Sequence, residues 1–167
     1  MLLNFDAVNL EDIKAPECFD IEEGINKLKL FPVFHDDQHG TAIVTLAGLI
    51  NAVKVVEKDM RACKVVINGA GAAGITIAKL LLHYGVKNVI VCDTAGVIYK
   101  GRPKNMNHAK DLIAEVTNLE NHKGTLNDVI VGADIFIGVS VAKALSKEQV
   151  ASMNTKSIVF ALANPTP

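Results

Sequence analysis

The sequence predicts an α/β fold in which a doubly wound parallel sheet carries helices on both faces. From about residue 63 onward, short runs of β-branched residues alternate with segments of helical periodicity. The strand-like runs are continuously apolar rather than alternating, as expected for strands buried on both faces of a parallel sheet. Alternating strands and helices favour a parallel sheet with right-handed crossovers.

Four buried strands are predicted in this part of the chain. They are the apolar runs Lys64–Asn68, Asn88–Asp93, Ile135–Val139 and Ser157–Leu162. A further strand position is less clearly marked, and Val97–Tyr99 is the segment that fits it. The sheet is therefore expected to contain four or five strands.

Helices are predicted between these strands. The segments with helical spacing are Gly74–Tyr84, His108–Val116 and Thr125–Val131. Gly85 and Gly132 follow the first and the last of them, where a glycine commonly ends a helix. These segments supply the crossover connections that a parallel sheet needs.

The part of the chain that precedes this alternation has a different pattern. Ala15–Cys18 is typical of a turn, Asp20–Leu30 has helical spacing, Phe31–His35 is a short apolar run, and Thr41–Glu57 is a second helix. Glu57–Asp59 is the expected connection to the α/β domain. We therefore expect a leading segment, residues 1–60, and an α/β domain, residues 61–167, that pack together as one unit.

Neither a membrane span nor a leader is predicted. The apolar run from Ala42 to Val56 is interrupted by Asn51 and Lys54. It is shorter than the roughly 20 residues of a spanning helix, so we expect a buried helix instead. The start of the chain, Met1–Asp6, has no basic flank and too short an apolar stretch for a signal peptide.

Composition excludes several classes of function. The 17 basic and 18 acidic residues give a net charge of −1, so neither nucleic acid nor an anionic membrane is an expected partner. Tryptophan is absent and aromatic residues make up only 5%, which leaves few surfaces on which bases could stack. Cys18, Cys63 and Cys92 match no zinc or disulfide spacing and are expected to be free thiols. A reducing cytoplasmic compartment fits best, and an organelle matrix would give the same pattern.

The strongest motif is the glycine-rich segment Gly69–Gly74, which has the G-x-G-x-x-G spacing. It follows a predicted strand and opens a predicted helix, the context in which this spacing indicates a dinucleotide site. Gly69 permits the tight turn, Gly71 lets the backbone approach a pyrophosphate, and Gly74 lets the helix pack close to the strand. The helix N-terminus offers N–H groups and a positive dipole end to the phosphates. The α/β domain is therefore predicted to be Rossmann-like.

An acidic residue stands where such a domain contacts the adenosine ribose. Asp93 ends the second predicted strand. The carboxylate that binds the ribose hydroxyls is expected about 20 residues after the glycine motif, and Asp93 follows Gly74 at that distance. A carboxylate there would repel a 2′-phosphate, so NAD is expected rather than NADP. The simpler alternative is that Asp93 only caps the turn before Thr94 and Gly96.

Two acidic pairs, Glu11-Asp12 and Asp36-Asp37, precede the nucleotide-binding domain. Carboxylates that converge from two segments would form a hard oxygen site suited to Mg²⁺ or Mn²⁺. Spacing alone favours simpler roles, in which Asp36 or Asp37 caps the following helix and the first pair is solvated. The sequence pattern by itself leaves both readings open.

Two histidines, His35 and His39, flank the second acidic pair. No third histidine or cysteine lies near them in the sequence, as a transition-metal site would require. We therefore expect structural or hydrogen-bonding roles for both.

Four stretches of the chain resemble malic enzymes of the bacterial type. They are Asn9–Phe19, Pro32–Ala42, Val66–Gly74 and Phe160–Pro165. The resemblance covers essentially the whole chain, and the acidic motifs and the glycine loop occur in the family's order. It implies oxidative decarboxylation of L-malate to pyruvate and CO₂ with reduction of NAD.

The resemblance also implies roles for individual residues. Glu11, Asp12 and Asp37 would bind Mn²⁺ or Mg²⁺, which would act as a Lewis acid on the substrate. Asp36 and Asn164 would be catalytic, Asp36 beside the metal and Asn164 facing the substrate and the nicotinamide. Together with the glycine motif, the resemblance implies a cofactor site made of Gly69, Ala70, Gly71, Ala72, Ala73, Gly74, Asp93, Ser140 and Asn164.

The chain also departs from the family pattern. The family's acid–base lysine and tyrosine and its substrate-binding arginine lie upstream of the position that matches Met1, and a further asparagine would lie beyond Pro167. We therefore expect this chain alone to be inactive or nearly so, since a general acid–base pair contributes orders of magnitude in rate. Val141–Lys143 stand where the family usually has an Ala-Pro-Gly-like turn, so the cofactor contacts of that loop are expected to differ.

Two other functions stay compatible with the sequence. One is a non-catalytic module that binds NAD and a partner subunit. The other is a different Rossmann dehydrogenase, such as a methylene-tetrahydrofolate or amino-acid enzyme, although the acidic pairs speak against it. The family resemblance further implies a homodimer or homotetramer with malate or pyruvate as its small-molecule ligand.

Overall fold

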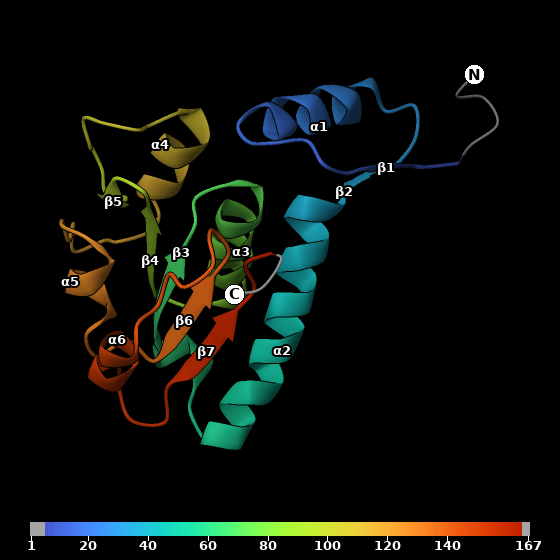
Figure 1. Cartoon of the computed structure of the whole chain (residues 1–167). Coiled ribbons are helices and arrows are strands. Elements are labelled where there is room, and N and C mark those ends of the chain that lie inside the picture. The colour runs from blue at the N-terminus through green and yellow to red at the C-terminus, as the bar shows by residue number, and fades with distance from the viewer. Residues whose placement is uncertain (1–5, 165–167) are drawn as a thin grey trace.

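The computed structural model describes residues 6–164 and shows a five-stranded sheet with helices on both faces (Figure 1). The strands are β3 (Lys64–Asn68), β4 (Asn88–Asp93), β5 (Gly96–Val97), β6 (Ile135–Gly138) and β7 (Ile158–Ala161). Their order is β5-β4-β3-β6-β7, and all neighbours are parallel except β5, which runs antiparallel to β4. The predicted doubly wound α/β fold is confirmed. Pro165, the last residue of the stretches that resemble the malic enzyme family, lies outside the described residues.

Each face of the sheet has its own hydrophobic core. The helices α2 (Thr41–Val56), α3 (Ala72–Tyr84) and α4 (His108–Ala114) supply apolar residues to one core, and α5 (Leu126–Ile130) supplies them to the other, near α6 (Lys147–Ser152). Successive strand residues point to opposite faces, so Val65 and Ile67 enter the first core while Val66 enters the second. This double burial explains the continuous apolar runs of β3, β4 and β6. The predicted burial of the last strand was only partly right, because β7 lies at the edge of the sheet and Val159 and Ala161 are exposed.

The strand order creates a crevice above β3. The chain moves from β3 to β4 on one side and later places β6 on the other side of β3. Such a reversal is the point where doubly wound sheets bind ligands, outside the carboxyl ends of the strands. The segments that leave this edge are the glycine loop after Asn68 and the loop after Gly138.

A second, two-stranded sheet lies apart from the large one. Its strands β1 (Val8–Leu10) and β2 (Val33–His35) are parallel, with Leu10 opposite His35, and α1 (Glu17–Leu28) connects them. Because parallel strands end at the same edge, the residues that follow them emerge side by side. Those residues are the two acidic pairs.

Several predicted elements needed correction. The fifth strand is not Val97–Tyr99 but Gly96–Val97, and it pairs with β4 as an antiparallel hairpin. The helix α6 was not predicted. The helix α1 begins at Glu17, so Cys18 belongs to a helix rather than to a turn.

The helix predicted over Ala42–Val56 is confirmed as α2, but its helical run is longer and its burial less complete than expected. A π-helical turn, Asp36–Gly40, continues directly into α2, and together they form a 21-residue helical run. By length and composition alone this run could cross a membrane, a test that single core helices also pass. Only one side of α2 is buried, and Ile43, Val44 and Val55 are exposed. A 3-10 turn at Met60–Ala62 then leads into β3.

Candidate functional site

The glycine loop connects β3 to α3 and is shaped by the chain's own packing at two of its three glycines. Gly69 has a φ of +130°, and a Cβ there would lie 2.9 Å from the backbone carbonyl of Val139. A Cβ at Gly74 would collide with the carbonyl oxygen of Gly69. A Cβ at Gly71 would meet open space. Gly69 and Gly74 are therefore required by the fold, whereas the open space at Gly71 is what an approaching pyrophosphate needs.

The start of α3 is available to an anion. Gly71 is its N-cap, and within residues 6–164 no side chain caps this helix. The first N–H groups of a helix have no partner within it, and here they belong to Ala72, Ala73 and Gly74. Together with the dipole of a 13-residue helix, they make this end suited to phosphate.

A pocket of about 640 Å³ opens beside this loop, at the crevice between β3 and β6. Its lining residues are Asn68, Gly69, Ala70, Gly71, Asp93, Thr94, Asn105, Lys110, Val139, Ser140, Val141 and Ala144. Five of the residues predicted to contact the cofactor lie in this lining, including Asp93 and Ser140. The sequence reasoning missed Asn68, which donates from Nδ2 to the Ser140 hydroxyl at 3.3 Å, as well as Asn105 and Lys110.

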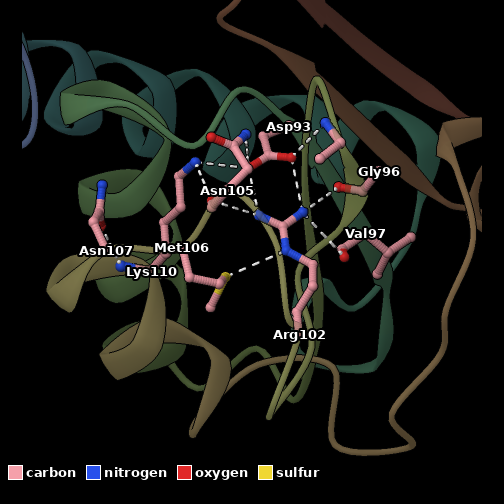
Figure 2. Close-up of polar contacts among 9 residues, drawn as sticks. Asp93, Gly96, Val97, Arg102, Asn105, Met106, Asn107 and Lys110 are labelled. Atoms are coloured by element: carbon pink, nitrogen blue, oxygen red, sulfur yellow. Dashed lines mark hydrogen bonds and ion pairs between the residues drawn. The ribbon is translucent and has the colours of Figure 1, made fainter.

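Asp93 is the centre of a hydrogen-bonded cluster, shown in Figure 2. Arg102 donates to both of its carboxylate oxygens, at 2.8 and 2.6 Å, and Lys110 donates to Oδ2 at 2.7 Å. Asn105 Nδ2 donates to Oδ2 at 3.0 Å, and the Ala95 amide donates to Oδ1 at 2.8 Å. The turn-capping role considered for Asp93 is therefore present, alongside two ion pairs that the sequence did not reveal.

The charge at Asp93 is fixed by these partners. Burial by itself would raise the pKa of the Asp93 carboxyl, but hydrogen bonds from Arg102 and Lys110 outweigh it and hold the pKa at about 2. The neighbouring Cys92 thiol has its pKa raised to about 12, first by burial and then by the Asp93 charge. One carboxylate faces two cations, so the cluster has a net charge of +1. The carboxylate that was expected to repel a 2′-phosphate is thus already paired with two cations.

The two acidic pairs meet at the end of the small sheet. The Asp12 amide donates to Asp37 Oδ2 at 2.8 Å, and Asp12 has a left-handed φ of +56°. Within residues 6–164, no group of three or more His, Cys, Asp or Glu side chains stands ready to hold a metal ion. Asp12 and Asp37 are thus adjacent, while the structure does not bring the carboxylate of Glu11 into a cluster with them. The oxygen donors fit the preference of Mg²⁺ or Mn²⁺.

Neither aspartate of the second pair caps a helix. Within the described part of the chain, no side chain bonds to the start of the π-helical turn or of α2. The Asp36 carboxylate instead folds back toward Gly40, where a Cβ would collide with its Oδ1. The capping alternative for Asp36 and Asp37 is therefore wrong. Single π-helical turns are frequent at functional sites.

The two flanking histidines take part in hydrogen bonds. His39 Nε2 lies 2.7 Å from Glu22 Oε1, and His35 Nδ1 lies 2.8 Å from Gln38 Nε2. His35 is fully buried. These contacts agree with the hydrogen-bonding roles expected for both residues.

Asn164 is not among the residues that line the pocket. It is exposed and lies beyond the end of β7. Its predicted place beside substrate and nicotinamide stays a prediction. In the loop after β6, Val141 lines the pocket and Lys143 has a left-handed φ of +56°.

Comparisons with known proteins identify the same family over almost all of the chain. Residues 38–167 match the family described as "Malic enzyme, NAD binding domain". The chain is 61% identical to the bifunctional malic/malolactic enzyme of Bacillus subtilis, covering 98% of this chain and 40% of that protein. It is 51% identical to a probable NADP-dependent malic enzyme of Rickettsia prowazekii, covering 98% of this chain and 21% of that protein.

A solved structure shares the fold. The NAD-dependent malic enzyme of Thermotoga maritima superposes with a TM-score of 0.94 at 46% identity, over 98% of this chain and 44% of that one. The chain thus spans less than half the length of each of these three proteins.

Proposed function

The chain belongs to the malic enzyme family and contains its NAD-binding domain, and on that premise we propose that it serves the oxidative decarboxylation of L-malate to pyruvate and CO₂. The observation that carries the proposal is the pocket between β3 and β6, where the glycine loop, the start of α3 and Ser140 converge. Family membership also removes the alternative of an unrelated Rossmann dehydrogenase.

Residues of this chain would bind different parts of the cofactor and the substrate. The backbone of Gly69–Gly71 and the first turn of α3 would bind the pyrophosphate, and Ser140 with Asn68 would line the path toward the nicotinamide. Hydride transfer is the chemistry that the nicotinamide supplies when it is bound. Asn164 would orient substrate at the end of β7.

Glu11, Asp12 and Asp37 would hold Mn²⁺ or Mg²⁺ at the edge of the small sheet. The bond between the Asp12 amide and Asp37 already joins the two segments. Lewis-acid polarisation of the malate oxygen is the chemistry that such an ion supplies when bound. Asp36, held over Gly40, would take part in proton transfer beside it.

For the cofactor we propose NAD, with weaker discrimination against NADP than an isolated aspartate would give. A carboxylate has about four acceptor positions, and five donors already contact Asp93. A ribose hydroxyl therefore meets Asn105 and Lys110 in the pocket wall as well as Asp93. The three comparison proteins include both NAD- and NADP-dependent enzymes, which supports this reading.

A fluorescence titration tests this function. NADH and NADPH are added to the protein with and without Mn²⁺, and malate-dependent reduction of NAD is followed in parallel. Saturable NADH binding with a modest preference over NADPH is the expected result. No binding of either dinucleotide would refute the cofactor site. Because this chain alone is expected to be inactive, malate turnover is also measured after the family's upstream region is supplied, and NADH binding without turnover under that condition would favour a non-catalytic NAD-binding module.

We further propose a homodimer or homotetramer in the cytoplasm. The exposed apolar residues of α2, Ile43, Val44 and Val55, form a face that a second copy would bury. Cys18, Cys63 and Cys92 are buried free thiols, which suits a reducing compartment. Sedimentation should show an oligomer, and a monomer at high concentration would contradict it.

A further inference from the structure

A buried histidine points at one of the proposed metal ligands. His35 ends β2, is 0% exposed, and lies two residues before Asp37. Its Nε2 is 3.3 Å from Asp37 Oδ2, close enough for an ion pair but not aligned for a hydrogen bond. Within residues 6–164 this nitrogen is the only buried side-chain N or O atom without a hydrogen-bond partner. Buried polar atoms are rarely left unpaired, so an unpaired one needs an explanation.

The contacts of Gln38 define which nitrogen of His35 carries the proton. Gln38 Nε2 lies 3.0 Å from Glu22 Oε2 and 2.8 Å from His35 Nδ1. An amide nitrogen has two hydrogens, and the Glu22 carboxylate can only accept. The reversed amide would place two oxygens against each other at Glu22, so the nitrogen faces both partners.

The contact of the Gln38 side-chain oxygen is consistent with this orientation of the amide. Thr76 Oγ1, on α3, donates to Gln38 Oε1 at 3.5 Å. Gln38 therefore donates to His35 Nδ1, which must be the unprotonated nitrogen of a neutral ring. The proton of neutral His35 is thus assigned to Nε2 from the hydrogen-bond network.

The Nε2–H group converges with a second donor on one oxygen of Asp37. The Asp12 amide already donates to Oδ2, and His35 approaches the same atom. Within the described chain this leaves Oδ1 for an external ligand.

We propose that His35 is a positioning residue that donates from Nε2–H to Asp37 and holds its carboxylate in the orientation that binds a divalent cation. This inference rests on the metal site of the proposed function. Groups that orient metal ligands in this way typically change metal affinity by about 10- to 100-fold when they are removed.

Three variants separate a donor role from simple packing. His35→Leu removes both ring nitrogens, whereas His35→Gln replaces Nε2 with an amide nitrogen at a similar distance from the backbone. His122→Gln is the matched control, because His122 is half-exposed and pairs with Glu120, outside the acidic segments. Mn²⁺ affinity is measured by electron paramagnetic resonance, and folding by circular dichroism.

We expect His35→Leu to weaken Mn²⁺ binding at least about tenfold, His35→Gln to restore it to within about threefold, and His122→Gln to leave it unchanged. Equal affinity of His35→Leu and the unmodified protein would overturn the inference. Equal loss in His35→Leu and His35→Gln would also overturn it, since packing alone would then explain the effect.

A second measurement does not depend on metal binding or on any variant folding. Nitrogen-15 NMR of the imidazole should show the Nε2–H form of neutral His35, and the Nδ1–H form would overturn the inference. Failure of the unmodified protein to bind Mn²⁺ would instead refute the proposed metal site, and the positioning role with it.

Discussion

The guanidinium of Arg102 contacts both carboxylate oxygens of Asp93, and the two side chains are only 4% and 8% exposed. Arg102 also donates to the carbonyls of Gly96, Val97 and Asn105, so it joins β5 to the loop before α4 (Figure 2). The cluster therefore fixes the wall of the nucleotide pocket as well as the charge of Asp93.

Arg102→Leu should destabilise the protein strongly. Lys110 would still compensate the charge of Asp93, but the substitution breaks the bidentate contact and the bonds to three carbonyls. Loss of a hydrogen bond to a charged group alone costs about 1.5–3 kcal/mol. Lys100→Gln is the control, because the Lys100–Glu115 pair is exposed and such pairs contribute about 0–1 kcal/mol. Urea denaturation measures both, and a loss in Arg102→Leu no larger than the roughly 1 kcal/mol of an exposed pair would contradict the structural role of the cluster.

The free energy of unfolding should decrease in acid because Asp93 becomes protonated. Its pKa is about 2 in the folded protein against 3.8 for the free side chain, so its contribution is complete above about pH 4 and is lost as the pH falls toward 2. The difference corresponds to about 2 kcal/mol. Urea denaturation between pH 6 and pH 3 should show this decline, and Asp93→Asn should show less of it. An equal slope in both proteins would be evidence against the assigned ionisation.

Two glycine substitutions should separate folding from cofactor binding. Gly74→Ala places a Cβ against the Gly69 carbonyl and should cost about 1–3 kcal/mol or more, because the backbone must move. Gly71→Ala meets open space, so stability should stay near normal while NADH binding weakens about tenfold, which is about 1.4 kcal/mol. Thermal unfolding and NADH titration together check the pair. Unchanged NADH affinity in folded Gly71→Ala would remove Gly71 from the pyrophosphate site.

Mn²⁺ should stabilise the protein through Asp37 and not through Asp36. A ligand at 100 times its Kd stabilises the folded state by about 2.7 kcal/mol, so the melting temperature should rise with Mn²⁺ and fall again with EDTA. Asp37→Asn should abolish the rise, whereas Asp36→Asn should keep it. Identical behaviour of the two variants would argue against assigning different roles to these neighbours.

The sequence predicted the parts of the fold that depend on local pattern. The strands β3, β4, β6 and β7 lie within the sheet, and the burial of the first three on both faces is visible as continuous apolar runs. The helix α6 was missed because it buries no residue fully, yet a signal existed. Ser146 and Gln149 form a capping box, and their spacing is typical of a helix start.

Other features depend on contacts that no local pattern shows. The strand β5 is very short, and its turn needs Gly96 because a Cβ there would collide with the carbonyl of Gly124, which lies beyond α4 in the chain. The ion pairs of Asp93 come from residues 9 and 17 positions later in the chain. The spacing from the glycine motif predicted that Asp93 lies in the pocket, but it could not predict that Arg102 and Lys110 pair with its carboxylate.

The unbroken passage from the π-helical turn into α2 has a mechanical consequence. At about 1.5 Å per residue, the 21-residue run is about 32 Å long, with Asp37 at one end and the connection to β3 at the other. A tilt of about 5° at the far end would move Asp37 by about 3 Å, more than the length of a metal–oxygen bond. The bond from Thr76 on α3 to Gln38 opposes such a tilt, so this contact helps to fix the distance between the acidic edge and the nucleotide pocket.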